Sequence, residues 1–289
     1  MNKIIFSKQE LLSHLADPEY VIIDCRYNLS DPQWGYRSYC ESHIPGAIYA
    51  DLNKNLSSSP TIHSGRHPLP DQNEFIAFLS KIGVNLNKNV VVYDTAKGSM
   101  AARLWWMLRS FGHVNTTLLD GDFSGWLQED YPISKVPEWG SPTKFSGIYD
   151  SKYEVDMETI RQNLHSNEYL LIDARAPERY RGEIEPIDPV AGHIPGAINW
   201  FYENNLDDDG YFLPPARLNA MIKNISEGVS AEKMIVYCGS GVTSCLNVAA
   251  FEYAGFSGAR LFVPSWSGWC SYQENPVSLG DERKGTTQK

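Results

Sequence analysis

The stretch Ile235–Gly255, IVYCGSGVTSCLNVAAFEYAG, contains a complete strand, loop and helix. Its first three residues form a short apolar run with branched side chains, which is typical of a buried strand. The glycine-bearing loop 238–243 follows, and from about Ser244 the apolar residues continue in a helical pattern until Gly255 ends it. Buried strands that alternate with helices predict a parallel sheet covered on both faces. We therefore expect an α/β protein.

The first half of the chain shows the same alternation. Short apolar runs predict strands, and Ser or Asp followed three residues later by Glu predicts the starts of helices. The expected elements of this half are strands at 20–24, 89–94 and 117–120, helices that begin at Ser7 and Asp71, and a helix over 100–111 closed by Gly112.

Four motifs of the first half recur in the same order in the second half. The clearest is Ser42–Ile48, SHIPGAI, which reappears as Gly192–Ile198, GHIPGAI. Matches in one order with slowly drifting offsets indicate a duplication with small changes in loop length. The other three pairs are Tyr20–Asp24 with Tyr169–Asp173, Val91–Asp94 with Ile235–Cys238, and Phe123–Trp126 with Trp266–Trp269.

The length of 289 residues fits two domains, since one domain takes about 150 residues. We expect a first domain over 1–133, a linker over 134–150, a second domain over 151–280 and a flexible tail over 281–289. The linker assignment rests on a run of Pro, Gly and Ser with little apolar periodicity.

Charge and cysteine content exclude several classes of protein. Lys and Arg total 25 against 35 Asp and Glu, and this net charge of −10 disfavours nucleic acid as a partner. No apolar run approaches the roughly 18 residues of a membrane-spanning helix.

Five irregularly spaced cysteines without a C-x-x-C pair indicate free thiols and no metal site. With no signal-like N-terminus, we expect a cytoplasmic protein.

The position of Cys238, between a strand and the start of a helix, favours a reactive thiol. The carboxyl edge of an open α/β sheet is where ligands bind, and the amides of a tight loop can converge on an anion. The positive end of the following helix favours a thiolate, which is the nucleophilic form. Most free cysteines are simply buried. The duplication argues against that reading, because the first half has Asp94 at the equivalent position.

The sequence CGSGVT at 238–243, together with the two copies of HIPGA, resembles the two-domain rhodanese-type sulfurtransferases. The resemblance extends from about Glu10 to Pro276. It implies two tandem α/β domains, each a mainly parallel sheet with helices on both faces, of which only the second is active. It also implies that Cys238 takes sulfur from a donor, becomes a persulfide and passes the sulfur to an acceptor, without a cofactor. The loop residues that would hold the persulfide or the donor are Gly239, Ser240, Gly241, Val242 and Thr243.

The resemblance also bears on the donor. Thiosulfate-preferring members carry basic residues just after the cysteine, whereas Gly239 and Ser240 are uncharged and resemble the 3-mercaptopyruvate sulfurtransferases. Arg179 matches the substrate-binding arginine of the family, and a planar carboxylate suits a bidentate Arg. A further arginine usual in those enzymes is missing from 184–189. We therefore consider Arg66 as its replacement, and His67 as the group that protonates the leaving enolate.

Two other functions fit part of this pattern. A cysteine phosphatase uses Cys-x5-Arg, and the residue six positions after Cys238 is Ser244, so phosphate-ester hydrolysis is disfavoured. A non-enzymatic persulfide carrier would have the same loop and differs only in lacking turnover. The preferred hypothesis is a sulfurtransferase that moves sulfur from 3-mercaptopyruvate or thiosulfate to a thiol, thioredoxin or cyanide.

Overall fold

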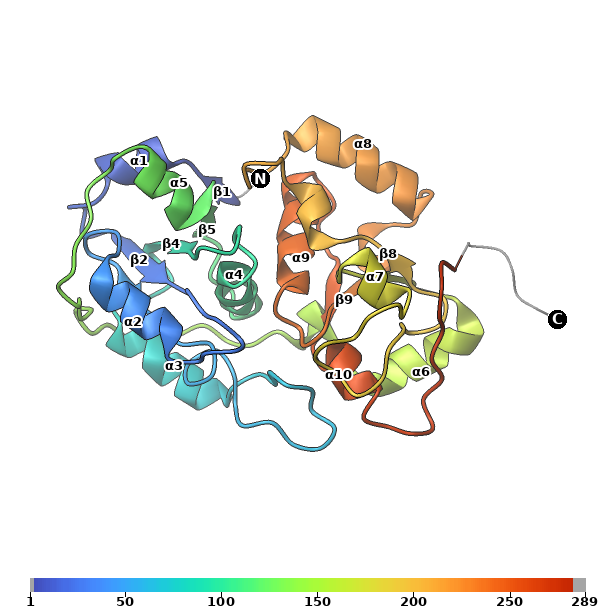
Figure 1. The fold of residues 1–289 in the computed structure, drawn as a ribbon. Helices are drawn as coiled ribbons and strands as arrows, with labels where there is room; N and C mark the ends of the chain where they lie inside the picture. Colours follow the sequence, from blue (N-terminus) through green and yellow to red (C-terminus); the bar gives the residue numbers. More distant parts are fainter. Residues whose placement is uncertain (1–2, 283–289) are drawn as a thin grey trace. The chain divides into compact units, whose positions relative to one another are not determined.

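The computed structural model describes residues 3–282, and its internal contacts divide the chain into two compact units (Figure 1). Unit 1 comprises Met1–Ser58, Leu69–Asp150 and Leu206–Phe212. Unit 2 comprises Ser59–Pro68, Ser151–Asn205 and Leu213–Lys289. Residues 134–150, which we expected to link the two halves, belong to unit 1. Of the expected tail, residues 283–289 lie outside the described part.

Unit 1 is built on a five-stranded parallel sheet with the strand order β1-β5-β4-β2-β3. The central pair is in register from Tyr20 opposite Asn89 to Asp24 opposite Tyr93. These two strands are the apolar runs that the sequence predicts. The five strands are β1 (Ile5–Phe6), β2 (Tyr20–Asp24), β3 (Ile48–Tyr49), β4 (Asn89–Tyr93) and β5 (Thr116–Leu119).

Helices cover both faces of this sheet. On one face α1 (Lys8–Ser13) and α5 (Asp122–Gln128) pack against alternate strand residues in a common core that includes Leu11, Val91 and Trp126. The predicted capping box at Ser7 is present. The remaining helices are α2 (Trp34–Glu41), α3 (Gln72–Lys81) and α4 (Ala101–Ser110), of which α4 packs on β4 and β5.

Unit 2 has the same strand order, β6-β10-β9-β7-β8, and is also parallel throughout. The core on one face joins the sheet to side chains of α6, α7 and α10. Helices α8 and α9 pack together, and α9 lies on β9 and β10. The strands are β6 (Glu154–Val155), β7 (Leu170–Asp173), β8 (Ile198–Asn199), β9 (Met234–Tyr237) and β10 (Arg260–Phe262), and the helices are α6 (Met157–Ser166), α7 (Pro177–Tyr180), α8 (Pro215–Ser226), α9 (Ser244–Tyr253) and α10 (Ser265–Trp269).

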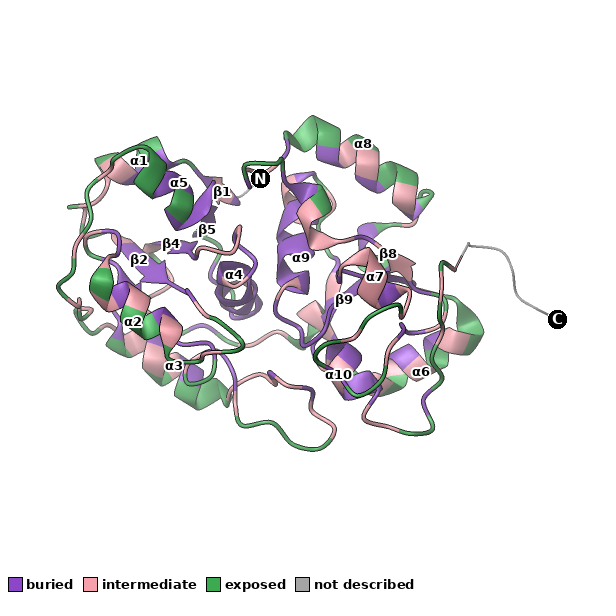
Figure 2. Ribbon diagram, in the orientation of Figure 1, coloured by how far each residue is buried: buried purple, intermediate pink, exposed green. Residues whose placement is uncertain are grey.

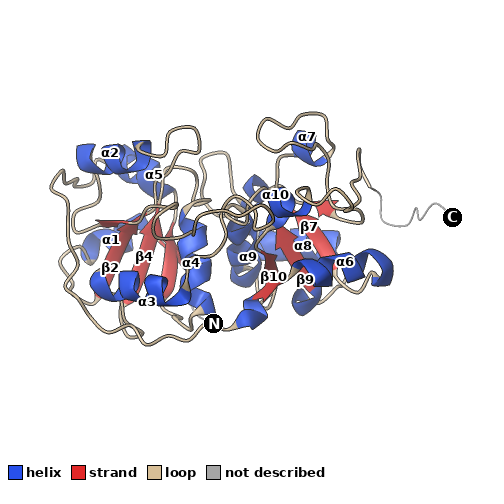
Figure 3. Cartoon of the chain, turned by 90° about the horizontal axis from the view of Figure 1, so that it is seen from below, coloured by secondary structure: helices blue, strands red, loops and turns tan. Residues whose placement is uncertain are grey.

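The identical strand orders confirm the predicted α/β class and the duplicated architecture. Figure 3 shows helices on both sides of the strands in each unit. In Figure 2, α9 is buried from Ser244 to Phe251, whereas α8 keeps an exposed outer face. Within residues 3–282 we find no helix that is long and apolar enough to span a bilayer.

The repeated HIPGA motif has the same structural role in both units. The ring of His43 stacks on Tyr39 and its Nδ1 lies 2.6 Å from the Tyr39 carbonyl oxygen. His193 is placed in the same way on Tyr180, with a distance of 2.7 Å. Both rings are fully buried and make the same contacts in the two units, so these histidines support the fold.

Each unit also contains a short segment from the other half of the sequence. We call residues 59–68 the first exchanged segment and residues 206–212 the second. In unit 2 the first packs Gly65 onto the Pro264 backbone. In unit 1 the second donates the Phe212 amide to Asp120, and Tyr211 contacts the amine of Lys8. The exchanged segments follow equivalent positions of the duplication, so the exchange is reciprocal.

Candidate functional site

Cys238 is the first residue after β9, in the loop that leads into α9. Its amide donates to the Oγ of Ser265 at 3.2 Å, and its carbonyl oxygen accepts from the Trp266 amide at 2.9 Å. The start of α10 thus holds the loop at its first residue. Cys238 has an exposed fraction of only 2%, which on burial alone would suit an inert core thiol.

The hydrogen bonds around the thiol argue against an inert role. Burial raises the pKa of Cys238, but the hydroxyls of Ser244 and Thr243 and the amides of Ser240 and Ser244 outweigh it. The net result is a pKa below the ordinary thiol value. Ser244 Oγ donates to the sulfur at 3.3 Å. The two hydroxyls contribute most and the loop amides add to them, so the hydrogen bonds of this loop favour a thiolate.

Two glycines keep the loop compact. Gly241 has φ +72°, and a Cβ there would lie 2.4 Å from the Val263 carbonyl oxygen, so both conformation and space require glycine. A Cβ on Gly239 would lie 2.8 Å from the Nη2 of Arg66 and 3.7 Å from both Nη atoms of Arg179. The two arginines named from the sequence thus meet over the residue next to Cys238.

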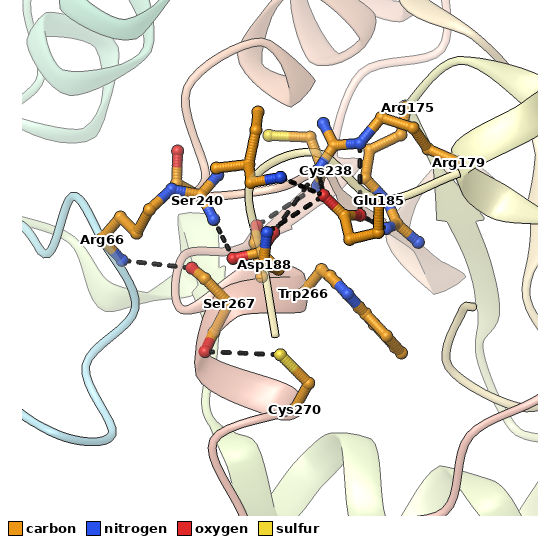
Figure 4. Close-up of polar contacts among 12 residues, drawn as sticks. Arg66, Arg175, Arg179, Glu185, Asp188, Cys238, Ser240, Trp266, Ser267 and Cys270 are labelled. Carbon is orange, nitrogen blue, oxygen red and sulfur yellow. Dashed lines mark hydrogen bonds and ion pairs between the residues drawn. The ribbon is translucent and has the colours of Figure 1, made fainter. Parts of the chain in front are cut away.

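Arg179, on α7, is held by two acidic side chains (Figure 4). Its Nε and Nη2 donate to Glu185 at 3.2 and 2.6 Å, and Nη2 also lies 3.4 Å from Oδ2 of Asp188. Burial raises the pKa of Glu185, but the hydrogen bonds from Arg179 and from the Asp188 amide bring it below the usual value. Glu185 is therefore charged and orients Arg179.

Arg66 reaches the loop because the first exchanged segment belongs to unit 2. Its Nη1 is ion-paired with Asp188, and its amide donates to the Oγ of Ser267 at 3.1 Å. The same segment is anchored at His63, whose ring stacks on Tyr272 with centroids 3.8 Å apart. A residue 172 positions before Cys238 in the sequence is thereby brought beside it.

His67 belongs to the same segment and contacts the loop directly. Its Nδ1 lies 2.8 Å from the Oγ of Ser240, and both side chains are largely buried. All the residues named from the sequence therefore gather around one loop: Cys238, Gly239, Ser240, Gly241, Val242, Thr243, Arg179, Arg66 and His67.

The equivalent loop in unit 1 explains why that half lacks a comparable site. The carboxylate of Asp94 accepts hydrogen bonds from the amides of Ala96 and Gly98 at 2.7 and 2.8 Å. It accepts two more from Met100 and Ala101 at 2.7 and 2.8 Å. Asp94 is fully buried, so its own side chain fills the anion cradle that its loop amides form.

Three residues of the site were missed by sequence reasoning. Ser244 was considered only as the residue that replaces a phosphatase arginine, although a hydroxyl at a helix start is a usable signal. Glu185 and Asp188 lie in the segment that was noted only for its missing arginine. Glu185 lies only six positions after Arg179, so their ion pair is a local one that the sequence could have suggested. The ion pair of Asp188 with Arg66 could not be inferred, because it joins residues 122 positions apart.

The other thiols near the loop are less suited to nucleophilic chemistry. Cys245 is fully buried on α9, and its thiol donates to the Gly241 carbonyl oxygen at 3.4 Å. Burial, followed by the charge of Asp188, raises the pKa of Cys270 to about 11. Cys238 is thus the thiol of this region with the chemistry of a nucleophile.

Comparison with known proteins identifies the family. Residues 7–129 and 156–272 both match the family described as Rhodanese-like domain. The chain is 40% identical over 279 residues to a protein of Pseudomonas aeruginosa named as a probable 3-mercaptopyruvate sulfurtransferase, covering 96% of this chain and 98% of the relative. It is 31% identical over 283 residues to the thiosulfate sulfurtransferase of Cricetulus griseus, covering 96% and 94%.

A solved structure agrees with these sequence relatives. The 3-mercaptopyruvate sulfurtransferase from Leishmania major superposes with a TM-score of 0.79 at 29% identity, over 92% of this chain and 73% of that one. Because the family match covers most of the chain, and relatives of nearly full length share the same type of activity, this chain belongs to the rhodanese family and is a two-domain sulfurtransferase.

Proposed function

We propose that the chain transfers sulfur from a small anionic donor, 3-mercaptopyruvate in preference to thiosulfate, through a persulfide on Cys238. The observation that carries the proposal is the convergence on one loop of a thiol with a lowered pKa and two guanidinium groups. A nucleophile and cations within reach of the same small ligand are what attack on an anionic sulfur donor requires.

In the first step, the thiolate of Cys238 attacks the donor sulfur and forms an S–S bond. With 3-mercaptopyruvate, the C–S bond breaks and its electron pair leaves on the enolate of pyruvate, which takes up a proton. With thiosulfate, the S–S bond breaks and sulfite leaves with the electron pair. The contact of His67 with Ser240 supports a role for His67 as the proton source for the enolate.

The preference for 3-mercaptopyruvate is supported by the charges of the site. Arg66 and Arg179 are both paired with acids, and the loop positions Gly239 and Ser240 carry no charge. Such a balanced site suits one carboxylate better than a dianion. The Pseudomonas aeruginosa relative carries the matching name.

In the second step, an acceptor attacks the outer sulfur of the persulfide and restores the thiolate. We propose a small thiol, thioredoxin or cyanide as acceptor, and ping-pong kinetics follow from the two half-reactions. The five cysteines are all free thiols, which supports a reducing compartment such as the cytoplasm.

Intact-mass measurement after addition of 3-mercaptopyruvate or thiosulfate, without an acceptor, tests the proposal. The wild type should gain the mass of one sulfur, faster with 3-mercaptopyruvate. Cys238→Ala should gain none, and Cys245→Ala, a matched loss of a nearby buried thiol, should behave as wild type. Equal labelling of Cys238→Ala would contradict the proposal. Pyruvate release beyond one equivalent when acceptor is added separates an enzyme from a persulfide carrier.

A further inference from the structure

Asp188 connects the two arginines of the site. Its carboxylate has an exposed side-chain fraction of only 3% and pairs with Nη1 of Arg66 through Oδ1. Its Oδ2 lies 3.4 Å from Nη2 of Arg179. The arginines come from separate parts of unit 2, the first exchanged segment and α7, so one buried carboxylate joins both to the segment that follows α7 (Figure 4).

The two arginines depend on Asp188 to different degrees. Arg179 is held by Glu185 through two hydrogen bonds and gains Asp188 as a more distant third contact. Arg66 has a side chain that is 26% exposed, and within residues 3–282 no group accepts a hydrogen bond from its buried Nε. Asp188 is the acidic group that fixes this guanidinium. Its loss should release Arg66 and leave Arg179 largely in place.

We propose that Asp188 is a positioning residue for donor binding, which holds Arg66 beside Gly239 so that Arg66 and Arg179 face the donor together. This inference rests on the proposed function and specifies how its anionic donor is bound. Asp188 acts through Arg66 and does not itself touch the reacting sulfur.

The same carboxylate sets the charge that a donor meets. Three arginines and three carboxylates form one connected network of ion pairs with no net formal charge: Arg66, Arg175, Arg179, Asp173, Glu185 and Asp188. A monocarboxylate therefore gains hydrogen bonds without meeting a strong excess of positive charge. Replacing Asp188 by Asn leaves one excess positive charge, which attracts a dianion about twice as strongly as a monoanion at the same distance. Asp188 therefore also biases the site towards 3-mercaptopyruvate over thiosulfate.

Steady-state kinetics with cyanide as acceptor and thiocyanate as the common product test both effects. For Asp188→Asn, we expect KM for 3-mercaptopyruvate to rise about tenfold or more, with kcat within about threefold of wild type. Arg66→Met should give a similar change. The double variant should be at most about twofold worse than either single variant, because the two residues act as one unit. The ratio of kcat/KM for thiosulfate to that for 3-mercaptopyruvate should rise in Asp188→Asn.

Glu183→Gln is the matched control. It makes the same chemical change in the same segment, but Glu183 is exposed and pairs with Arg181. Its kinetics should equal those of wild type. The proposal would be overturned if the loss of kcat/KM in the double variant equalled the product of the losses in the two single variants. A wild-type KM in Asp188→Asn would also overturn it. If Asp188→Asn does not fold, Asp188→Glu takes its place, because it keeps the charge and moves the carboxylate by one methylene; an unchanged KM there would again overturn the proposal.

The experiments distinguish a failure of the proposed function from a failure of the positioning role of Asp188. If wild type forms no persulfide on Cys238 with either donor, the proposed function itself is wrong. If wild type forms the persulfide and the Asp188 variants bind donor normally, only the positioning role is wrong.

Discussion

The Oγ of Ser244, the first residue of α9, lies 3.3 Å from the Sγ of Cys238 and donates a hydrogen bond to it. This bond stabilises the thiolate more than the thiol, so it opposes the effect of burial on the pKa. We expect Ser244→Ala to raise the pKa of Cys238, because a hydrogen bond that favours the thiolate is lost. The variant should therefore be alkylated more slowly than wild type at neutral pH. The rate of alkylation by iodoacetamide, measured against pH, reports the pKa directly.

Cys238→Ala supplies the background rate from the other four thiols in that measurement. A Ser244→Ala profile that coincides with wild type after subtraction would show that the hydroxyl does not stabilise the thiolate.

His67 should matter for one donor more than for the other. Release of the pyruvate enolate needs a proton, whereas sulfite is a weak base and leaves without one. We expect His67→Phe to lower kcat with 3-mercaptopyruvate by about 10- to 100-fold, with a much smaller effect with thiosulfate. Stopped-flow measurement of persulfide formation with each donor checks this. Equal losses with both donors would indicate that His67 only supports the loop through Ser240.

Arg179 should not be replaceable by lysine. Arg179 donates twice to Glu185, a geometry that one ammonium group cannot reproduce. We expect Arg179→Lys to raise KM for 3-mercaptopyruvate about tenfold. Arg181→Lys, a change at the partly exposed residue that follows α7, is the control and should leave KM unchanged. A normal KM in Arg179→Lys, measured by initial rates of pyruvate release, would exclude Arg179 from donor binding.

Asp94 should make stability depend on pH. Burial, followed by the charge of Asp122, raises the pKa of Asp94 to about 6 in the folded chain. The unfolded value is about 3.9, so between these pH values the folded state binds the proton more tightly. The free energy of unfolding should therefore fall as pH rises from about 4 to about 6, by at most about 3 kcal/mol from this group.

Urea unfolding of wild type and Asp94→Asn between pH 4 and 7 tests this expectation. Asparagine loses two of the four amide contacts, which lowers stability at every pH, so only the dependence on pH is compared. The decrease in the free energy of unfolding between pH 4 and 6 should be smaller in Asp94→Asn than in wild type. Parallel curves would mean that Asp94 does not titrate in this range.

The features that the sequence predicted correctly are local ones. The runs that became β2 and β4, and the loop after β9, are contiguous in sequence, so periodicity and glycine placement were enough to find them. The strands β1 and β6 were not predicted, because two residues at a sheet edge leave almost no pattern.

The contacts that complete the site are long-range. The ion pair of Arg66 with Asp188 joins residues 122 positions apart, and His67 meets Ser240 across 173. Both exist because the first exchanged segment belongs to unit 2. Arg66 and His67 were named as candidates by resemblance to a family, but their partners could be found only once the fold was known.

The reciprocal exchange of segments gives a reason why the first half, whose loop has no cysteine, is retained in the chain. A shortened gene that encoded only the second half would lack Arg66, His67 and the anchor at His63. A gene that encoded only the first half would lack Tyr211 and Phe212, which contact Lys8 and Asp120. Neither copy could be lost by deletion without damage to the other. Selection on the sulfur chemistry of one half therefore also preserves the other.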